Sequence, residues 1–273
     1  MTGLALWALA ACAQEEAVTP LVVEVPPSGL ALASTNLPDK AEEIIQAHFD
    51  STDRSETFYT TEVASAHMHV IGVDQLCPLH VHRTANEATI IVTGSPDVAH
   101  VYAEEGERVE TQEQFGPGSL VSSPPFTGHE WDNNTGAHQA NLVLAYPSFD
   151  GNLYLRPDDP RMDQGTAPFS YHPDDDVEDF VASGQPFDRL DLPIMEGRMS
   201  RLFVGEQYEL PATSEDHGLL YAVSGEGMLR GAGTERAITP GTLLVFLRPA
   251  PVVIEATGDQ PLALYLFEPP VTN

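Results

Sequence analysis

An internal repeat of strand-forming segments constrains the fold of this chain more than any other feature. EATIIVTGSP aligns with GLLYAVSGEG, and FGPGSLVSSPP aligns with ITPGTLLVFLRP. The alignment pairs Gly94 with Gly225 and Gly118 with Gly241, so the second glycine follows the first by 24 residues in one copy and by 16 in the other. Self-similarity of this kind indicates one supersecondary unit used twice. We therefore predict two copies of one β-barrel.

The segments around these glycines have the pattern of short antiparallel strands. From Thr57 onward, β-branched and aromatic runs alternate with Gly, Pro, Asn and Asp, and a second such series follows residue 186. This spacing is typical of a sandwich or barrel, and the fold class predicted is all-β. Two segments are expected to be helical, LPDKAEEIIQAHF near the start and the shorter DDVEDFVAS.

Composition divides the chain into four parts. The boundaries that we predict are a leader and tether at 1–17, an N-terminal barrel at 18–150, an acidic and Pro-rich linker at 151–186, and a C-terminal barrel at 187–273. The linker is assigned from its many Pro and Asp residues and its lack of periodicity.

The first twelve residues resemble a secretion signal. An apolar run from Leu4 ends in Leu9-Ala10-Ala11-Cys12, which is similar to the lipobox of bacterial lipoproteins, where the cysteine is lipidated. The usual basic residues before the run are missing, which a misassigned start codon would explain; a chance apolar N-terminus is the alternative. We expect a lipid anchor at the bacterial cell envelope, or otherwise a secreted or periplasmic protein. Cys77 would then have no disulfide partner.

The charge of the chain excludes several classes of partner. Twelve basic residues stand against 41 acidic ones, which gives a net charge of −29. Such a field repels nucleic acid and anionic lipid headgroups. We expect a small-molecule ligand, and contact with a membrane only through the lipid anchor. Formation of a homodimer is one of the roles considered for the second barrel.

Three histidines and one glutamate are placed to meet inside the first barrel. His80 and His82 are two residues apart on a predicted strand, so both imidazoles emerge from the same face. Glu87 opens the next strand, and His129 follows a later one. Three imidazoles and a carboxylate suit iron(II), manganese, nickel or zinc, and leave coordination positions open. We predict one divalent transition metal here; the alternative is four polar residues that recur at this spacing by chance.

The spacing resembles the two motifs of the cupin superfamily. The first motif is a histidine, any residue, a histidine, four residues, a glutamate, six residues and a glycine; the second is a glycine, five residues, a proline, four residues, a histidine, three residues and an asparagine. The matching positions are His80, His82, Glu87 and Gly94, then Gly118, Pro124, His129 and Asn133. One departure is Phe126, which stands where the family often has glycine. The resemblance implies a jelly-roll barrel with the metal inside.

The second copy keeps the glycines but not the ligands. The same spacing places Pro211 and Thr213 at the two histidine positions, Gly218 at the glutamate position and Val252 at the last histidine. We therefore predict a bicupin with a metal only in its N-terminal barrel. The C-terminal barrel is expected to serve packing, dimerisation or closure of the first barrel's mouth.

Several neighbouring residues are candidates for the substrate pocket. His67 and His69 share a strand face and could act on the substrate or orient a ligand, so they are our candidate catalytic residues. Thr89 and Ile91 share the face of Glu87, and Trp131 lies two residues beyond His129; a core tryptophan is equally consistent. Cys77 is expected to be a small buried apolar residue.

The family resemblance permits several activities. Its members include dioxygenases, decarboxylases, isomerases and lyases, and one fold hosts many chemistries. No tyrosine or lysine adjoins the ligands in the sequence, which leaves His67, His69 or a metal-bound hydroxide as the base. We favour an enzyme acting on a small oxygenated organic substrate, dioxygenase-like or a lyase or isomerase. The alternative is a surface-tethered protein that binds a small molecule or carbohydrate with a non-catalytic metal.

Overall fold

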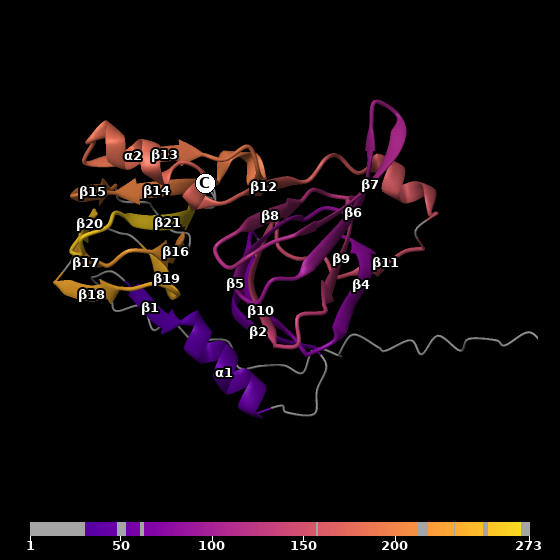
Figure 1. The fold of residues 1–273 in the computed structure, drawn as a ribbon, viewed down its shortest axis with the longest axis horizontal. Coiled ribbons are helices and arrows are strands. Elements are labelled where there is room, and N and C mark those ends of the chain that lie inside the picture. Colours follow the sequence, from indigo (N-terminus) through magenta and orange to yellow (C-terminus); the bar gives the residue numbers. More distant parts are fainter. Residues whose placement is uncertain are drawn as a thin grey trace, which may run out of the picture.

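The computed structural model describes residues 31–47, 53–60, 63–156, 158–211, 218–231, 233–247 and 251–268 of the chain. Two β-barrels lie side by side in it, each built from two antiparallel sheets (Figure 1). The predicted all-β fold of two barrels is confirmed. The lipobox-like segment, the proposed tether and Thr213 lie outside the described residues. Within the described part, no helix has the length and apolar character needed to cross a membrane.

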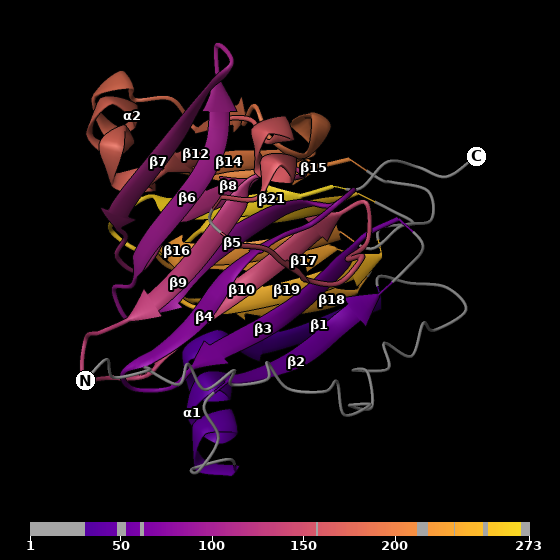
Figure 2. The same ribbon diagram turned by 90° about the vertical axis from the view of Figure 1, so that its right-hand side faces the viewer.

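The first barrel has sheets of six and five strands, in the orders β12-β8-β5-β10-β3-β2 and β11-β4-β9-β6-β7. Figure 2 shows this barrel in front, with β4, β9 and β6 neighbouring one another. The bounds are β2 Asp53–Thr60, β3 Ser65–Ile71, β4 Gln75–Val81, β5 Asn86–Thr93, β6 Asp97–Glu104, β7 Glu107–Gln114, β8 Leu120–Ser123, β9 Gly128–Asn133, β10 Gln139–Tyr146, β11 Leu153–Tyr154 and β12 Phe169–Tyr171.

The second barrel has sheets of six and four strands, in the orders β1-β19-β16-β21-β14-β13 and β15-β20-β17-β18. The bounds are β1 Ala31–Asn36, β13 Phe187–Asp191, β14 Met199–Val204, β15 Gln207–Leu210, β16 Gly218–Ser224, β17 Gly227–Gly231, β18 Thr234–Ile238, β19 Thr242–Leu247, β20 Val252–Ala256 and β21 Leu262–Phe267.

The strand orders confirm the internal repeat. In the two six-stranded sheets, β8, β5, β10 and β3 take the places of β19, β16, β21 and β14. The paired glycines also share one backbone conformation, with positive φ of 85° and 81° at Gly94 and Gly225, and of 89° and 83° at Gly118 and Gly241. An L side chain rarely adopts this conformation, which explains why glycine occurs at these positions in both copies.

The barrels exchange their outermost strands. β1 precedes the first barrel in sequence but pairs with β19 of the second, while β12 precedes the second barrel but pairs with β8 of the first. The range 151–186, predicted as a linker, also supplies β11 to the sheet that contains His80 and His129. These segments therefore have structural roles that composition alone did not indicate, and the four domain boundaries stay a proposal.

The helices form where the sequence predicted them. α1 (Leu37–Ala47) begins after Asn36, whose side-chain oxygen accepts a hydrogen bond from the backbone N–H of Asp39, and it buries Ala41 and Ile44. α2 (Val177–Ser183) ends at Gly184 in the left-handed conformation. Three single turns of 3₁₀ helix complete the elements: Pro160–Gln164, Pro173–Asp175 and Met195–Gly197.

The main hydrophobic core lies between the barrels, not inside either of them. It joins Met68, Ile90 and Leu142 of one six-stranded sheet to Leu219 and Leu243 of the other. The interior of the second barrel is a separate core made almost entirely of leucine, isoleucine and valine. It includes Val252, which aligns with His129 of the first barrel. In the part of this barrel that the structure describes, the interior thus presents apolar side chains.

Candidate metal centre

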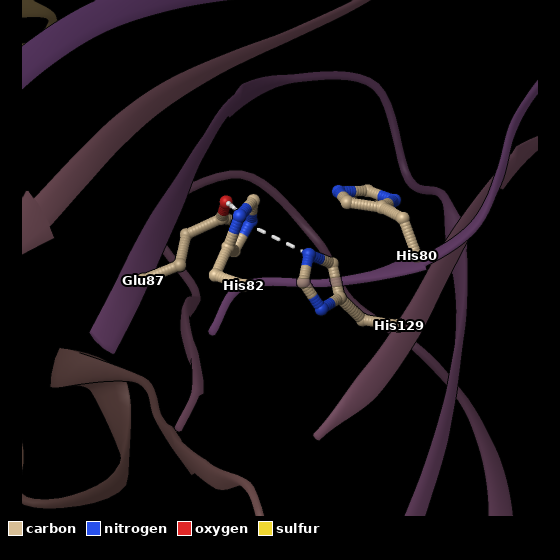
Figure 3. Close-up of side chains that lie close together, drawn as sticks. All are labelled: His80, His82, Glu87 and His129. Atoms are coloured by element: carbon tan, nitrogen blue, oxygen red, sulfur yellow. Dashed lines mark hydrogen bonds and ion pairs between the residues drawn. The ribbon is translucent and has the colours of Figure 1, made fainter. Parts of the chain in front are cut away.

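The four predicted ligands converge inside the first barrel from three strands (Figure 3). His80 comes from β4, His82 directly follows the last residue of that strand, Glu87 comes from β5 and His129 from β9, and one possible ligand atom from each lies within 4.8 Å of the others. β4 and β9 are adjacent and place His80 opposite His129, whereas Glu87 reaches the cluster from the other sheet of the barrel. All four residues are at most 5% exposed. In the described residues, this is the one group of its kind that could hold a metal ion.

Backbone carbonyls orient all three imidazoles in the same way. Nδ1 of His80 lies 2.9 Å from the carbonyl oxygen of Pro78, Nδ1 of His82 lies 3.2 Å from that of Gly151, and Nδ1 of His129 lies 3.1 Å from that of Thr127. A carbonyl oxygen can only accept, so each Nδ1 carries the proton. In a neutral ring the lone pair is then on Nε2, the tautomer required for metal binding through that atom.

The Nε2 atoms fit a cation between them and Glu87. Nε2 of His82 is 2.9 Å from one carboxylate oxygen of Glu87, and Nε2 of His129 is 3.6 Å from the other. Nε2 of His129 is buried and makes no hydrogen bond. Such a group is costly inside a protein unless something binds it. An orphaned lone pair beside a buried carboxylate is the arrangement that a divalent metal satisfies.

The site shifts the pKa values of the four ligands in different directions. Burial lowers the pKa of His129 to about 4, and burial together with the neighbouring imidazolium charges lowers the pKa of His80 well below its usual value. For His82 the hydrogen bond and charge of Glu87 outweigh burial and raise the pKa. Burial alone would raise the pKa of Glu87, but the adjacent histidines lower it well below the usual range. Of the three imidazoles, that of His82 is therefore the one whose protonated form the site favours.

This difference predicts how metal binding depends on pH. At about pH 5.5, binding is expected to release one proton, from His82, because the other ligands are already unprotonated. Affinity should fall about tenfold for each unit of pH below the pKa of His82. Calorimetric titration with zinc in two buffers of different ionisation enthalpy measures the protons released. Release of two or three protons would contradict the assignment of the low pKa values.

The predicted pocket residues occupy two environments. Thr89 donates a hydrogen bond from Oγ1 to Glu87 Oε1 at 3.0 Å, so it fixes the carboxylate. Ile91 and Trp131 pack with the buried Cys77 in an apolar cluster farther along the barrel. Cys77 is thus buried among apolar side chains, as expected. Whether Thr89, Ile91 and Trp131 contact a substrate stays a prediction.

The candidate catalytic residues lie on β3, outside the cluster. His67 and His69 are partly exposed, in contrast to the buried ligands. The ring of His67 is 5.7 Å from that of Phe149, which in turn contacts His82. Solvent therefore reaches this inner face of the barrel near the metal ligands. The catalytic role of both histidines stays a prediction.

Two further residues adjoin the cluster that the sequence did not single out. His100 on β6 is 3% exposed and pairs in register with His129, and its Nε2 is 3.4 Å from Oγ of Ser123. Tyr154 on β11 pairs with His80 across the sheet, with the two ring centroids 5.8 Å apart. Both residues reach the site through strand pairing, so no short spacing motif marks them.

The second motif positions of the first barrel have structural roles. Nδ2 of Asn133 donates to three carbonyl oxygens, those of Ile71, Gly72 and Ala137, at 2.7–3.2 Å, and so ties together the ends of β3 and β9. Phe126, which replaces the frequent family glycine, has a φ of +62°. The corner thus keeps the backbone conformation that glycine would adopt most easily.

Comparisons with known proteins agree with this fold and site. Residues 51–152 match the family model described as Cupin. No curated protein matches the chain. The predicted cupin resemblance is confirmed for the first barrel, and it covers both of the motifs that carry the cluster.

Solved structures extend the likeness to both barrels. The chain is similar to a salicylate 1,2-dioxygenase from Pseudaminobacter salicylatoxidans, with a TM-score of 0.60 and 14% identity over 93% of this chain and 90% of that one. It is also similar to a cupin 2 conserved barrel domain protein from Leptotrichia buccalis, with a TM-score of 0.57 and 10% identity over 87% and 96%. Procruciferin, an 11S globulin from Brassica napus, gives a TM-score of 0.54 and 14% identity over 79% and 80%. At these identities the likeness shows the fold alone.

Proposed function

We propose that this two-barrel cupin binds one divalent transition metal at His80, His82, Glu87 and His129, and that it is an enzyme acting on a small oxygenated organic substrate. The observation that carries the proposal is the common orientation of the three imidazoles, whose Nδ1 atoms all donate to carbonyls while Nε2 of His129 has no partner. Structural histidines have no reason to share a tautomer around a carboxylate. Iron(II), manganese, nickel and zinc all suit this donor set.

Different residues of the barrel would have different roles around a bound metal. A bound metal would supply Lewis acidity or, if it is iron, a route to dioxygen. The carbonyls of Pro78, Gly151 and Thr127 hold the imidazoles, and Thr89 holds Glu87. The low exposure of the ligands excludes bulk water, which strengthens every electrostatic interaction within the site. His67 and His69, the two partly exposed residues of β3, are the proposed groups that move a proton.

Two reaction classes remain within the proposal, dioxygenation and lyase or isomerase chemistry. A salicylate dioxygenase among the similar structures supports the first, but an 11S globulin shares the same fold. The second candidate function is binding without turnover, by a protein anchored at the bacterial cell envelope through Cys12 or otherwise secreted or periplasmic. The net charge of −29 supports either role with a small-molecule partner and disfavours nucleic acid.

Elemental analysis of protein purified without added metal tests the proposal. One equivalent of metal per chain is expected, and spectroscopy under nitrogen and then in air identifies redox-active iron. Iron that changes its spectrum with air favours the dioxygenase, whereas zinc favours a lyase, an isomerase or the binding protein. Purified protein that neither contains nor takes up any of the four metals would refute the site.

A further inference from the structure

The segment that follows β10 covers one side of the metal cluster. It runs from Phe149 to Tyr154 and is fixed to the barrel at several points. The backbone N–H of Phe149 donates to Oγ of Ser65 at 3.2 Å, and the carboxylate of Asp150 accepts from the backbone N–H of Arg83 at 3.0 Å. The carbonyl of Gly151 holds Nδ1 of His82. This segment is therefore part of the site and not a loose connection.

Phe149 places an aromatic ring against two histidines. Its ring centroid is 4.6 Å from that of His82 and 5.7 Å from that of His67, with interplanar angles of 56° and 72°. His82 is buried, whereas Phe149 and His67 are partly exposed. The phenyl ring of Phe149 thus lies between the buried His82 and the partly exposed His67 on β3.

Tyr154 places a second aromatic ring next to His80. Its ring centroid is 5.8 Å from that of His80, and its hydroxyl accepts a hydrogen bond from Nδ2 of Asn152 at 3.2 Å. Tyr154 is 47% exposed, whereas His80 is 4% exposed. Exposure therefore rises steeply from His80 to this ring, which lies at the solvent-exposed edge of the site.

We propose that Phe149 and Tyr154, the aromatic rim, select a flat aromatic or conjugated substrate that carries an oxygen group for the metal. The inference rests on the proposed function, because the oxygen group needs a metal at the cluster. Aromatic rings favour other rings in edge-to-face or offset geometry, with an energy beyond the area that they bury. A saturated ring of the same size is thicker and lacks the π-system. The hydroxyl of Tyr154, oriented by Asn152, donates to a polar substituent.

A matched pair of carboxylates tests the rim on cobalt(II)-loaded protein. Benzoate and cyclohexanecarboxylate both offer a carboxylate to the metal, but only benzoate is flat. Visible absorption of the cobalt reports binding without any need for turnover, and azide serves as a small probe that reaches the metal without filling the rim. We expect benzoate to bind about tenfold more tightly than cyclohexanecarboxylate, the sum of two ring contacts.

Variants assign the preference to the two rings. Phe149→Leu and Tyr154→Leu should each reduce the preference about threefold, and the double variant should abolish it, with azide binding unchanged. Leu76→Ala is the matched control, since Leu76 is also 47% exposed on the strand of His80 but neighbours the inward Cys77 and so points outward. The preference of the Leu76→Ala protein for benzoate over cyclohexanecarboxylate should equal that of the unmodified protein.

The possible failures can be told apart. Azide binding together with equal affinities for the two carboxylates would overturn the aromatic rim and leave the metal site intact. A preference for benzoate that survives in the double variant would also overturn the rim. Failure of cobalt to bind at all would overturn the proposed function, and the rim with it.

Discussion

Replacing Glu87 with glutamine is expected to lower metal affinity by more than about 100-fold and to abolish turnover, because even residues that only orient a ligand contribute 10–100-fold. Glu87 is the one carboxylate of the cluster, and its oxygens face Nε2 of both His82 and His129. Glutamine keeps the size of the side chain and an oxygen for Thr89 but removes the charge that balances the cation. Titration against a competing chelator measures the affinity.

Glu130→Gln is the control for this experiment. Glu130 lies next to His129 on β9, so strand alternation directs it to the other face, and burial raises its pKa. The same chemical change there should leave both metal content and turnover as in the unmodified protein. A Glu87→Gln protein that keeps one equivalent of tightly bound metal would show that the carboxylate is no ligand.

The sequence predicted the cluster because its spacing information is local. His80 and His82 share a face through strand alternation, and Glu87 follows after one turn. His129 is more distant in the chain, and only the second motif related it to the others. In the structure, pairing of β4 with β9 places His80 opposite His129, and Glu87 meets them from β5 of the other sheet. Four residues with a fixed separation were therefore sufficient to predict the place, though not the metal.

Residues that reach the site by long-range pairing could not be predicted in this way. His100 comes opposite His129 because β6 pairs with β9, and Tyr154 comes opposite His80 because β11 pairs with β4. β11 has only two residues and lies in a segment whose composition indicated a linker. A strand that short carries no periodic signal, so the tyrosine that adjoins the ligands is evident only in the structure.

The exchange of strands between the barrels has the same explanation. β12 lies in the range that composition assigned to the linker, and nothing in the sequence of β1 or β12 specifies a partner strand. Each lies at the same relative position, beside β19 or β8, so the exchange repeats the symmetry of the duplicated fold. Sequence similarity within the chain predicted the two barrels, but strand exchange depends on which sheets pack against each other. The hydrophobic core between the two six-stranded sheets brings their edge strands close together.

Gly118 lies where the two barrels touch, and replacing it with alanine is expected to lower the free energy of unfolding by about 3 kcal/mol. Its φ of +89° costs an L residue about 1–2 kcal/mol. A Cβ would also lie 2.7 Å from Cγ1 of Val223 and 3.0 Å from Nε2 of His172, and overpacking of this kind costs about 1–3 kcal/mol. In addition, the carbonyl of Gly118 accepts a hydrogen bond from the hydroxyl of Tyr265 in the second barrel at 2.9 Å. Denaturant unfolding measures the change.

Two further variants separate backbone strain from contact between the barrels. Gly136 has a φ of +73° with no atom within 4 Å of its Cβ position, so Gly136→Ala should cost only the strain, about 1–2 kcal/mol. Adding Val223→Ala to Gly118→Ala removes the closest atom, and the double variant should cost less than the sum of its single changes. Strict additivity, or a Gly118→Ala effect no larger than that of Gly136→Ala, would mean that the barrels do not pack against each other at this glycine.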